Sequence, residues 1–351
     1  MVRLSDIAKD LGLSLSVVSR ALSVNPDKYA VVKQETAERI RKYAQEVGYT
    51  PNRQASFLGK GKCATIFCFL PDVPTRLIAD LMFGIAEAAR ELNFPVNFFL
   101  GKCCDDLSSF LRDSKRNPHS GLLTFPPSKM PAHVFADVEQ YHKGGGNILV
   151  LNTISNSGAI YGSKGFWGIP SLNIDEAYGG KLAASHLLQC GCDRFFVLSE
   201  GHPDIYNTRE QGFADYLHEK NRDFTVVTAG DLSALTIPPG EKWGFFADSD
   251  YSALDQYALF ESKKWKFGKN VFLCGFDDIF YSRISKPSLT TIHQPTREEG
   301  RAALRELVSM IFGKQGKDQL VKPWLCHRET TGGKRPDPEF PENENWITDL
   351  V

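Results

Sequence analysis

The sequence predicts a multidomain α+β chain, with a small all-helical head at the N-terminus followed by two α/β halves. Its 351 residues exceed the roughly 100 to 200 residues of a typical single domain. The first fifty residues hold short amphipathic helical stretches interrupted by glycine. From Thr65 onward, apolar strand-like runs alternate with helical stretches, which is the pattern of βα units around a parallel sheet.

The head begins with two short helices separated by a glycine. Residues 5–11 form the first, with Ser5 as its expected N-cap and with Ile7, Ala8 and Leu11 on one face. Gly12 ends this helix and Ser14 starts the second, SLSVVSRAL. Two short helices around a glycine-containing turn are typical of a helix-turn-helix motif. A plain helical hairpin without a DNA role is the alternative.

A third helix is expected from Lys33 to Val47, and Gly48 to Pro51 end it. Its predicted buried face comprises Ala37, Ile40, Ala44 and Val47.

The second helix of such a motif enters the DNA major groove with its N-terminal residues at the base edges. Arg20 could form a bidentate contact with guanine, Ser16 could bond to several bases, and Leu15 could touch a thymine methyl group.

The charge distribution supports a polyanionic partner for the head. The first 62 residues contain 11 Lys and Arg against 6 Asp and Glu, whereas the whole chain contains 41 and 42. A basic head therefore precedes an acidic body.

The head also resembles the LacI/GalR (lactose-repressor) family. Its run LSDIAKDLGLSLSVVSRAL follows that family's DIAxxAGVSxxTVSRxLN, and TAERIRKYAQEVGYTPNRQASFL follows the family's third helix and hinge. The chain departs from the pattern at Val17, Ser23 and Ser56, where Thr, Asn and Arg are usual. Val17 cannot supply the hydroxyl contact to phosphate that Thr could. The resemblance and the helix positions together give the expected DNA-binding residues: Ser5, Leu15, Ser16, Val17, Ser19, Arg20, Asn52, Ala55 and Leu58.

The resemblance implies that the segment 50–62 is the family's hinge helix, which would become ordered only on DNA and would insert paired Leu58 side chains into the minor groove. Such a wedge kinks the duplex. A flexible linker is the alternative interpretation of the same residues.

The body shows two sets of alternating strands and helices. Apolar runs in the first set are TIFCFLP, VNFFL, GLLTF and ILVLN, and those in the second are SLNID, FFVLS, WGFFAD and VFLCGFDD. Ligands of open α/β sheets bind at the carboxyl ends of the strands, and two facing halves form a cleft there. Polar residues at these positions are therefore candidates: Asp72, Asn152, Asp175, Asp248 to Asp250, Asp277, Asp278 and, at a helix start, Arg209. Helix capping is the alternative role for the aspartates.

The family resemblance continues through NTREQGF, FFADSDYSAL, VFLCGFDD, ISKPSLTTIHQP and LCHRETTGG, up to about residue 333. It implies two Rossmann-like subdomains of periplasmic-binding-protein type. The expected divisions are a head at 1–49, a hinge at 50–62, a body at 63–333 and a tail at 334–351. Within the body, the first half takes 63–165 and 293–325 and the second takes 166–292, with the strand at Leu289 to Gln294 returning to the first half. The expected effector-binding residues are Asp72, Leu77, Asn152, Arg209, Ser249, Asp250 and Asp277.

Three aromatic residues, Trp167, Tyr206 and Phe213, could stack on a sugar, although a role in the core is the commoner one. Leu77 and Ile78 stand where an aromatic pair is frequent in the family, and Ser249 replaces its usual Asn.

Several classes of function are disfavoured. GKGK at 59–62 and KGGG at 143–146 lack the spacing of phosphate loops, and HExxH and SxxK-like motifs are absent. The eight cysteines show no metal-ligand spacing, and most lie in apolar runs. We therefore expect no catalytic residues, metal site or cofactor. No signal peptide or apolar run of about 18 residues is visible, which predicts a cytoplasmic protein without membrane association.

The resulting hypothesis is a sequence-specific transcriptional regulator of the allosteric repressor type, acting as a homodimer on double-stranded operator DNA. Its DNA affinity is expected to respond to a sugar or sugar derivative. The alternatives are a non-catalytic transport-type sugar-binding protein and a sugar-processing enzyme.

Overall fold

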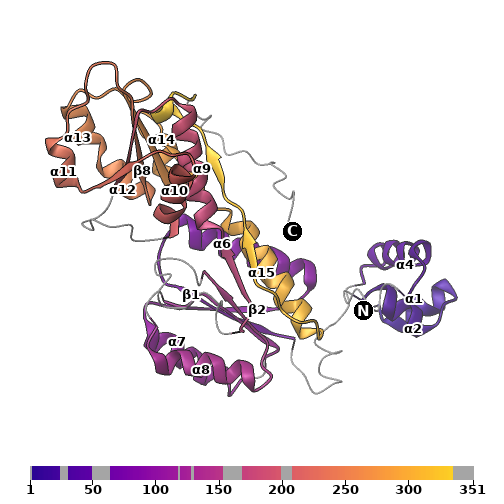
Figure 1. Ribbon diagram of the computed structural model, residues 1–351. Helices are drawn as coiled ribbons and strands as arrows, with labels where there is room; N and C mark the ends of the chain where they lie inside the picture. The colour runs from indigo at the N-terminus through magenta and orange to yellow at the C-terminus, as the bar shows by residue number, and fades with distance from the viewer. Residues whose placement is uncertain are drawn as a thin grey trace.

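The computed structural model describes residues 2–23, 31–49, 64–117, 119–127, 130–152, 168–198 and 208–334. The head consists of α1 (Leu4–Leu11), α2 (Leu15–Ala21) and α4 (Gln34–Glu46) (Figure 1). These helices pack around fully buried Ile7, Val18 and Ile40. The helix-turn-helix prediction agrees with this arrangement. The expected N-cap is wrong, because α1 begins at Leu4 and Arg3 occupies the cap position. Ser5 is instead exposed within the first turn.

Two residues set the turn between α1 and α2. Gly12 has a φ of 64°, in the left-handed region that disfavours residues with a Cβ. Ser14 caps α2, since its hydroxyl accepts a hydrogen bond from the Val17 amide at 3.3 Å. Val47, predicted as the last residue of the buried face, follows α4 as its C-cap and packs partly buried against the head core.

The first half of the body is a parallel sheet in the order β11-β5-β4-β3-β1-β2. Its elements from the first part of the chain are β1 (Ile66–Pro71), α6 (Arg76–Leu92), β2 (Val96–Gly101), α7 (Cys104–Ser114), β3 (Gly121–Thr124), α8 (Ala132–Lys143), β4 (Ile148–Leu151) and β5 (Ser171–Ile174). Two later elements, α15 (Thr296–Ile311) and β11 (Gln319–Val321), complete this half.

The second half is a sheet in the order β12-β10-β9-β8-β6-β7, parallel except for the antiparallel pair β10 and β12. Its elements are α9 (Glu176–Gln189), β6 (Arg194–Leu198), α10 (Thr208–Glu219), β7 (Phe224–Val227), α11 (Ala229–Ala234), β8 (Trp243–Ala247), α12 (Asp250–Asp255), α13 (Tyr257–Ser262), β9 (Val271–Asp277), α14 (Phe280–Ile284), β10 (Thr290–His293), β12 (Trp324–Cys326) and the short 3₁₀ helix η1 (Glu329–Thr331).

The sheet membership of three strands corrects the predicted halves. β5 pairs with β4 in the first sheet, so the predicted boundary at residue 166 is wrong for residues 171–174. β10 stays in the second sheet beside β9, and β12 joins it there, contrary to the predicted return at Leu289 to Gln294. β5 and β10 are short strands of mainly buried residues and β12 is a short, half-buried one, and such a run does not show from its own pattern which sheet it will join.

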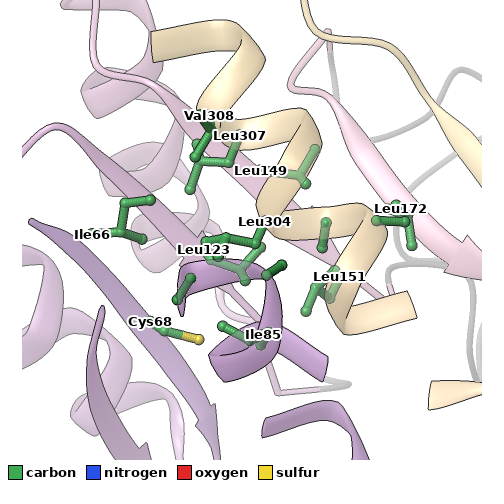
Figure 2. Close-up of a cluster of buried hydrophobic side chains, with 14 of the residues drawn as sticks. Ile66, Cys68, Ile85, Leu123, Leu149, Leu151, Leu172, Leu304, Leu307 and Val308 are labelled. Atoms are coloured by element: carbon green, nitrogen blue, oxygen red, sulfur yellow. The ribbon is translucent and has the colours of Figure 1, made fainter. Parts of the chain in front are cut away.

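Both faces of each sheet are covered. In the first half, α6 and α15 close one face over a cluster that includes Ile66, Leu123, Leu149 and Leu304 (Figure 2). The opposite face packs against α7 and α8. Strands buried on both faces read as continuous apolar runs, which explains why the sequence signal for them is strong. No helix in the described part of the chain is long and apolar enough to cross a bilayer.

Glycines let one pair of helices in each half approach closely. A Cβ added at Gly84 of α6 would lie 1.9 Å from the Arg297 carbonyl oxygen, and one at Gly300 of α15 would lie 2.4 Å from the Leu81 carbonyl oxygen. In the second half, a Cβ at Gly180 of α9 would lie 1.9 Å from the Arg209 carbonyl oxygen. Because these contacts sit near helix N-termini, they fix the side chains that begin α9, α10 and α15.

Candidate functional site

The outward face of α2 is the candidate DNA-reading surface. Leu15 is 53% exposed, and Ser16, Ser19 and Arg20 are exposed as well. Val17 is partly buried against the head core. The structure thus leaves most of the predicted base-contacting side chains of α2 accessible to a partner. The remaining predicted DNA contacts, Asn52, Ala55 and Leu58, lie outside the described residues.

The three head helices are tied together at their edges, which holds α2 in place. Arg41 Nε donates to the Ala21 carbonyl at 3.3 Å, at the end of α2. Tyr43 Oη donates to Asp10 at 2.9 Å, and this hydrogen bond is the main reason why the pKa of Tyr43 is raised. These contacts join α4 to both helices of the motif.

A cavity of about 230 Å³ lies at the carboxyl ends of the strands, between the two halves of the body. One side, which we call the apolar wall, comes from the first half and consists of Pro71, Val73, Leu77, Ile78, Leu81 and Phe125. The other side, the charged wall, comes from the second half and consists of Glu176 and Arg209. Polar residues at the margins complete the lining: Thr75, Asn152, Gln294 and Thr296.

Arg209 is the centre of the charged wall. Its Nε and Nη2 both donate to Glu176 Oε1, at 3.0 and 2.7 Å, and its Nη1 donates to Asp277 Oδ1 at 3.1 Å and to the Asp248 carbonyl at 2.7 Å. The guanidinium also lies 4.0 Å from the centroid of the Phe276 ring. Burial alone would lower the pKa of Arg209, but the neighbouring carboxylates of Glu176 and Asp277 outweigh burial and raise it. The cation is therefore neutralised from within the protein.

Two strand-end residues at this site adopt left-handed backbone conformations. Asn152 follows β4 with a φ of 50°, and Asp277 ends β9 with a φ of 117°. The Asp277 carboxylate accepts hydrogen bonds from Arg209 and, at 2.5 Å, from Gln294. Such conformations are costly for residues with a Cβ and persist where surrounding contacts hold them, commonly at functional sites.

A direct contact links the two halves beside the cavity. Arg76, the first residue of α6, donates from Nη2 to the Asp277 carbonyl at 2.6 Å. The same guanidinium pairs with Asp80 at 2.5 Å. Arg76 therefore ties the start of α6 to the end of β9, and any change in the separation of the halves would alter this contact.

The predicted effector residues divide into two groups. Leu77, Asn152 and Arg209 line the cavity, and Asp277 lies directly behind Arg209. The other three, Asp72, Ser249 and Asp250, are not among the lining residues.

The roles of those three residues are visible in their contacts. Asp72 is half exposed and pairs with Lys102 at 3.5 Å. Ser249 caps α12 by accepting a hydrogen bond from the Ser252 amide. Asp250 is fully buried and accepts hydrogen bonds from the Ile279 amide, Ser282 and Thr291, so it holds the segment after β9 in place. Burial raises the pKa of Asp250 to about 8.

Capping also explains Asp175, one of the predicted strand-end aspartates, because its carboxylate accepts a hydrogen bond from the Tyr178 amide at the start of α9. Phe213 is fully buried and stacks on Phe246 with ring centroids 4.9 Å apart, so it belongs to the core and not to the cavity. Trp167 and Tyr206 lie outside the described residues.

Sequence reasoning missed several lining residues, notably Glu176, Gln294, Thr75 and Thr296. Gln294 lies in the quoted run ISKPSLTTIHQP, at the point where the chain passes between the halves, and this position could have identified it. Glu176 had no such signal, because it follows Asp175 and resembles an ordinary first-turn acidic residue.

A second polar cluster lies at the edge of the second sheet. Asp278, His293 and Cys326 bring potential metal ligands within 4.8 Å of one another. However, Asp278 already pairs with Arg328, with Arg283 at 2.8 Å and with His293 at 2.8 Å. Two guanidinium groups on one carboxylate disfavour an additional cation, so this cluster is better explained as an internal ion-pair network.

Comparison with known proteins identifies relatives of both parts of the chain. The family model for bacterial regulatory proteins of the lacI family matches residues 3–52, and the model for periplasmic binding protein-like domains matches residues 184–331. The chain is 25% identical over 327 residues to the ribose operon repressor of Bacillus subtilis (strain 168). This alignment covers 89% of this chain and 92% of that protein.

Solved structures show the same fold. The lac repressor dimer bound to operator and the anti-inducer ONPF has a TM-score of 0.60 and 19% identity, with coverage of 94% of this chain and 99% of that one. A complex of the transcriptional regulator CelR with cellobiose has a TM-score of 0.61 and 18% identity, with coverage of 94% and 100%. These likenesses extend over the head and both halves of the body.

Proposed function

The chain is a transcription regulator of the LacI family, and we propose that its affinity for a near-palindromic operator is set by a small sugar held between the two halves of its body. The observation that carries this proposal is the cavity itself. It joins an apolar wall from one half to a charged wall from the other, so a ligand inside it would contact both.

The head is the DNA-binding part. The exposed face of α2 presents Leu15, Ser16, Ser19 and Arg20, and Arg20 forms no ion pair with another described residue. In helix-turn-helix proteins this face enters the major groove. We assign Arg20 to base recognition, with Ser5 and Ser16 as contacts to bases or phosphates.

A sugar suits a cavity that has one apolar wall and one charged wall. Aliphatic and aromatic side chains can pack against the carbon face of a sugar ring, while Asn152, Gln294, Thr296 and Glu176 offer donors and acceptors to its hydroxyl groups. The ribose operon repressor and the CelR complex with cellobiose are relatives whose names include a sugar. The residues we assign to the effector are Leu77, Asn152, Arg209 and Asp277.

Coupling between the two sites follows from the connections between the halves. The chain passes between them near Asp175, near Gln294 and between β11 and β12, and Arg76 bridges to Asp277. A ligand that favours one separation of the halves would shift the balance of conformations and hence DNA affinity. Couplings of this kind are typically about 1 to 3 kcal/mol.

We propose a homodimer, so that two heads meet two half-sites about one helical turn, ~34 Å, apart. Large apolar side chains are about half exposed on α12 and α14, namely Tyr251, Phe280, Tyr281 and Ile284. Exposed apolar residues gathered on neighbouring elements mark protein interaction sites. The lac repressor relative was solved as a dimer on its operator.

The proteins compared above are two repressors and one transcriptional regulator. We accordingly propose that the cavity binds its ligand without changing it chemically. A regulator of chromosomal operators acts in the cytoplasm, which is where we place this protein. A transport-type sugar-binding protein would have no use for the exposed α2 surface, so that alternative is not favoured.

The test is selection of bound sequences from a random duplex library by the full chain. We expect a near-palindromic site to be enriched, and Arg20→Ala to weaken binding to it by about 1 to 3 kcal/mol while affecting nonspecific DNA much less. The control is Lys9→Ala, which removes an exposed cation from α1. It should weaken binding to the selected site and to nonspecific DNA alike. Failure to enrich any site would contradict the proposal.

A further inference from the structure

A buried carboxyl group beside the cavity has no assigned role. Glu299 lies in the first turn of α15 and is 0% exposed. Its side chain lies near that of Asn152, which lines the cavity, and within electrostatic range of Glu176 of the charged wall. Thr296, three residues earlier on the same face of α15, also lines the cavity. Glu299 therefore sits where the cavity meets the first half.

Several buried polar atoms around this point lack a well-formed hydrogen bond. Within the described part of the chain these atoms are Glu299 Oε1 and Oε2, Glu176 Oε2 and Thr296 Oγ1. A hydrogen-bonding interaction with the Asn152 side chain nevertheless favours the ionised form of Glu299. Buried polar groups are normally hydrogen-bonded, and each exception calls for an explanation. A ligand with hydrogen-bond donors would supply the missing partners.

The charges around the cavity decide which ligands are excluded. Arg209 is already engaged by Glu176 and Asp277, and Arg76 by Asp80. Neither cation is thus left to neutralise a phosphate or carboxylate on a ligand. The Glu176 carboxylate, together with Glu299 whenever it is ionised, would face such an anion at close range, where like charges repel strongly in a partly desolvated site.

Building on the function proposed above, we propose that Glu299 is a ligand-contacting residue. Together with Glu176, it selects a sugar of neutral or amino form and rejects sugar phosphates and sugar acids. In this arrangement the ligand hydroxyl or amino groups donate to the two carboxyl groups, while its apolar face packs on Leu77 and Ile78. Burial raises the pKa of Glu299 to about 8, so near neutral pH the group can also exist as an acid and donate a hydrogen bond to a hydroxyl oxygen.

The first experiment measures thermal unfolding of the full chain, without DNA, against matched sugars. The probes are glucose, glucosamine, glucuronate and glucose 6-phosphate, with the corresponding galactose series, ribose and ribose 5-phosphate. We expect at least one neutral or amino member to raise the Tm in a concentration-dependent way, and its anionic counterparts to bind at least tenfold more weakly. Stabilisation by the anionic members, or by no member of the panel, would overturn the assignment.

Two variants separate ligand contact from a structural role. Glu299→Gln should weaken binding of the stabilising sugar at least tenfold, whereas Glu298→Gln, the neighbouring partly exposed carboxyl paired with Arg301, should leave its binding unchanged. In the ligand-free protein, Glu299→Leu should raise the Tm, because it removes a buried group without good partners. A lower Tm for that variant, or equal sugar binding by Glu299→Gln, would overturn the role of Glu299.

These measurements are independent of DNA. Loss of operator binding in the library selection would contradict the proposed regulator while leaving the ligand assignment open to its own result. Conversely, an operator released by a sugar phosphate would leave the regulator standing and overturn the ligand class.

Discussion

The two walls of the cavity are built on opposite physical principles. The apolar wall is made of side chains that end or follow β1, follow β3, or lie in the first two turns of α6. The charged wall is an ion-pair network in which Arg209 is neutralised by Glu176 and Asp277, while Glu176 Oε2 has no hydrogen-bond partner among the described residues. Substitutions in the first wall should therefore change ligand affinity, whereas substitutions in the second should disturb folding and ligand response together.

The largest effect is expected for Arg209→Ala. This change leaves the carboxylates of Glu176 and Asp277 buried without their cation, and breaking a buried pair from one side typically costs about 3 to 5 kcal/mol. Chemical unfolding of the variant should show that loss of stability. Arg90→Ala, an exposed arginine at the end of α6, should stay within about 0.5 kcal/mol of the parent. Equal stabilities of the two variants would mean that the ion pairs of Arg209 do not hold the charged wall together.

A smaller loss is expected for Gly180→Ala, which tests how the charged wall is positioned. The added Cβ would lie 1.9 Å from the Arg209 carbonyl oxygen, so the backbones of α9 and α10 must move apart. Overpacking of this kind costs about 1 to 3 kcal/mol, and it should weaken sugar binding as well.

The matched control for this change is Gly230→Ala in α11. There the nearest atom, Thr228 Oγ1, is 3.6 Å away, and alanine should be neutral or stabilising by up to about 1 kcal/mol. If Gly180→Ala proves as harmless as its control, close helix packing is not what places Arg209.

The apolar wall is tested by Ile78→Ala. Because Ile78 makes no charged contact, its truncation should remove only part of the apolar surface that the bound ligand covers. The expected loss of sugar-binding free energy is about 1 kcal/mol, which corresponds to a five- to tenfold weaker affinity. Calorimetric titration with the stabilising sugar measures this loss, and Ala79→Ser on the exposed side of α6 serves as the control. The variant should still discriminate between neutral and anionic sugars. Loss of this discrimination would contradict the assignment of affinity to the apolar wall and of charge selection to the carboxyl groups.

The pH dependence of stability gives the subtlest test. The pKa of Glu299 rises from 4.5 to about 8 on folding, so the folded state keeps a proton that the unfolded state releases. This group therefore adds no cost below about pH 4.5 and an increasing cost as pH rises toward 8. The difference in Tm between Glu299→Gln and the parent protein should accordingly grow in favour of the variant between pH 5 and pH 8. Other titrating groups, such as Asp250, are present in both proteins, so their contributions cancel in this difference. A constant Tm difference across this range would contradict the expected protonation.

The sequence carried strong information wherever a local pattern determined the structure. The head helices, the strand runs and the exposure of Leu15, Ser16 and Arg20 all follow from periodicity, and the family resemblance placed Asn152 and Arg209 at the cavity. The sheet that β5 or β10 joins could not be predicted, because the sequence of a short buried strand does not indicate which strand it will pair with. Asp250 has the same limitation, since an aspartate that follows a strand can bind a ligand, cap a helix or, as here, anchor a buried loop.

Glu299 illustrates the other limit of sequence reasoning. It lies in the run TREEGRAAL, where one acidic residue beside another in a first helical turn indicates a favourable helix dipole interaction on a solvated surface. Only the packing of α15 against α6, permitted by Gly84 and Gly300, turns that residue inward.

The most direct test of the account measures operator affinity of the full chain by fluorescence anisotropy while the stabilising sugar is titrated. The account predicts a change of about 5- to 150-fold in operator affinity, with a midpoint that matches sugar binding measured by calorimetry and moves to higher concentration in Glu299→Gln. An operator affinity that stays constant while the sugar saturates the cavity would contradict the coupling between the two sites.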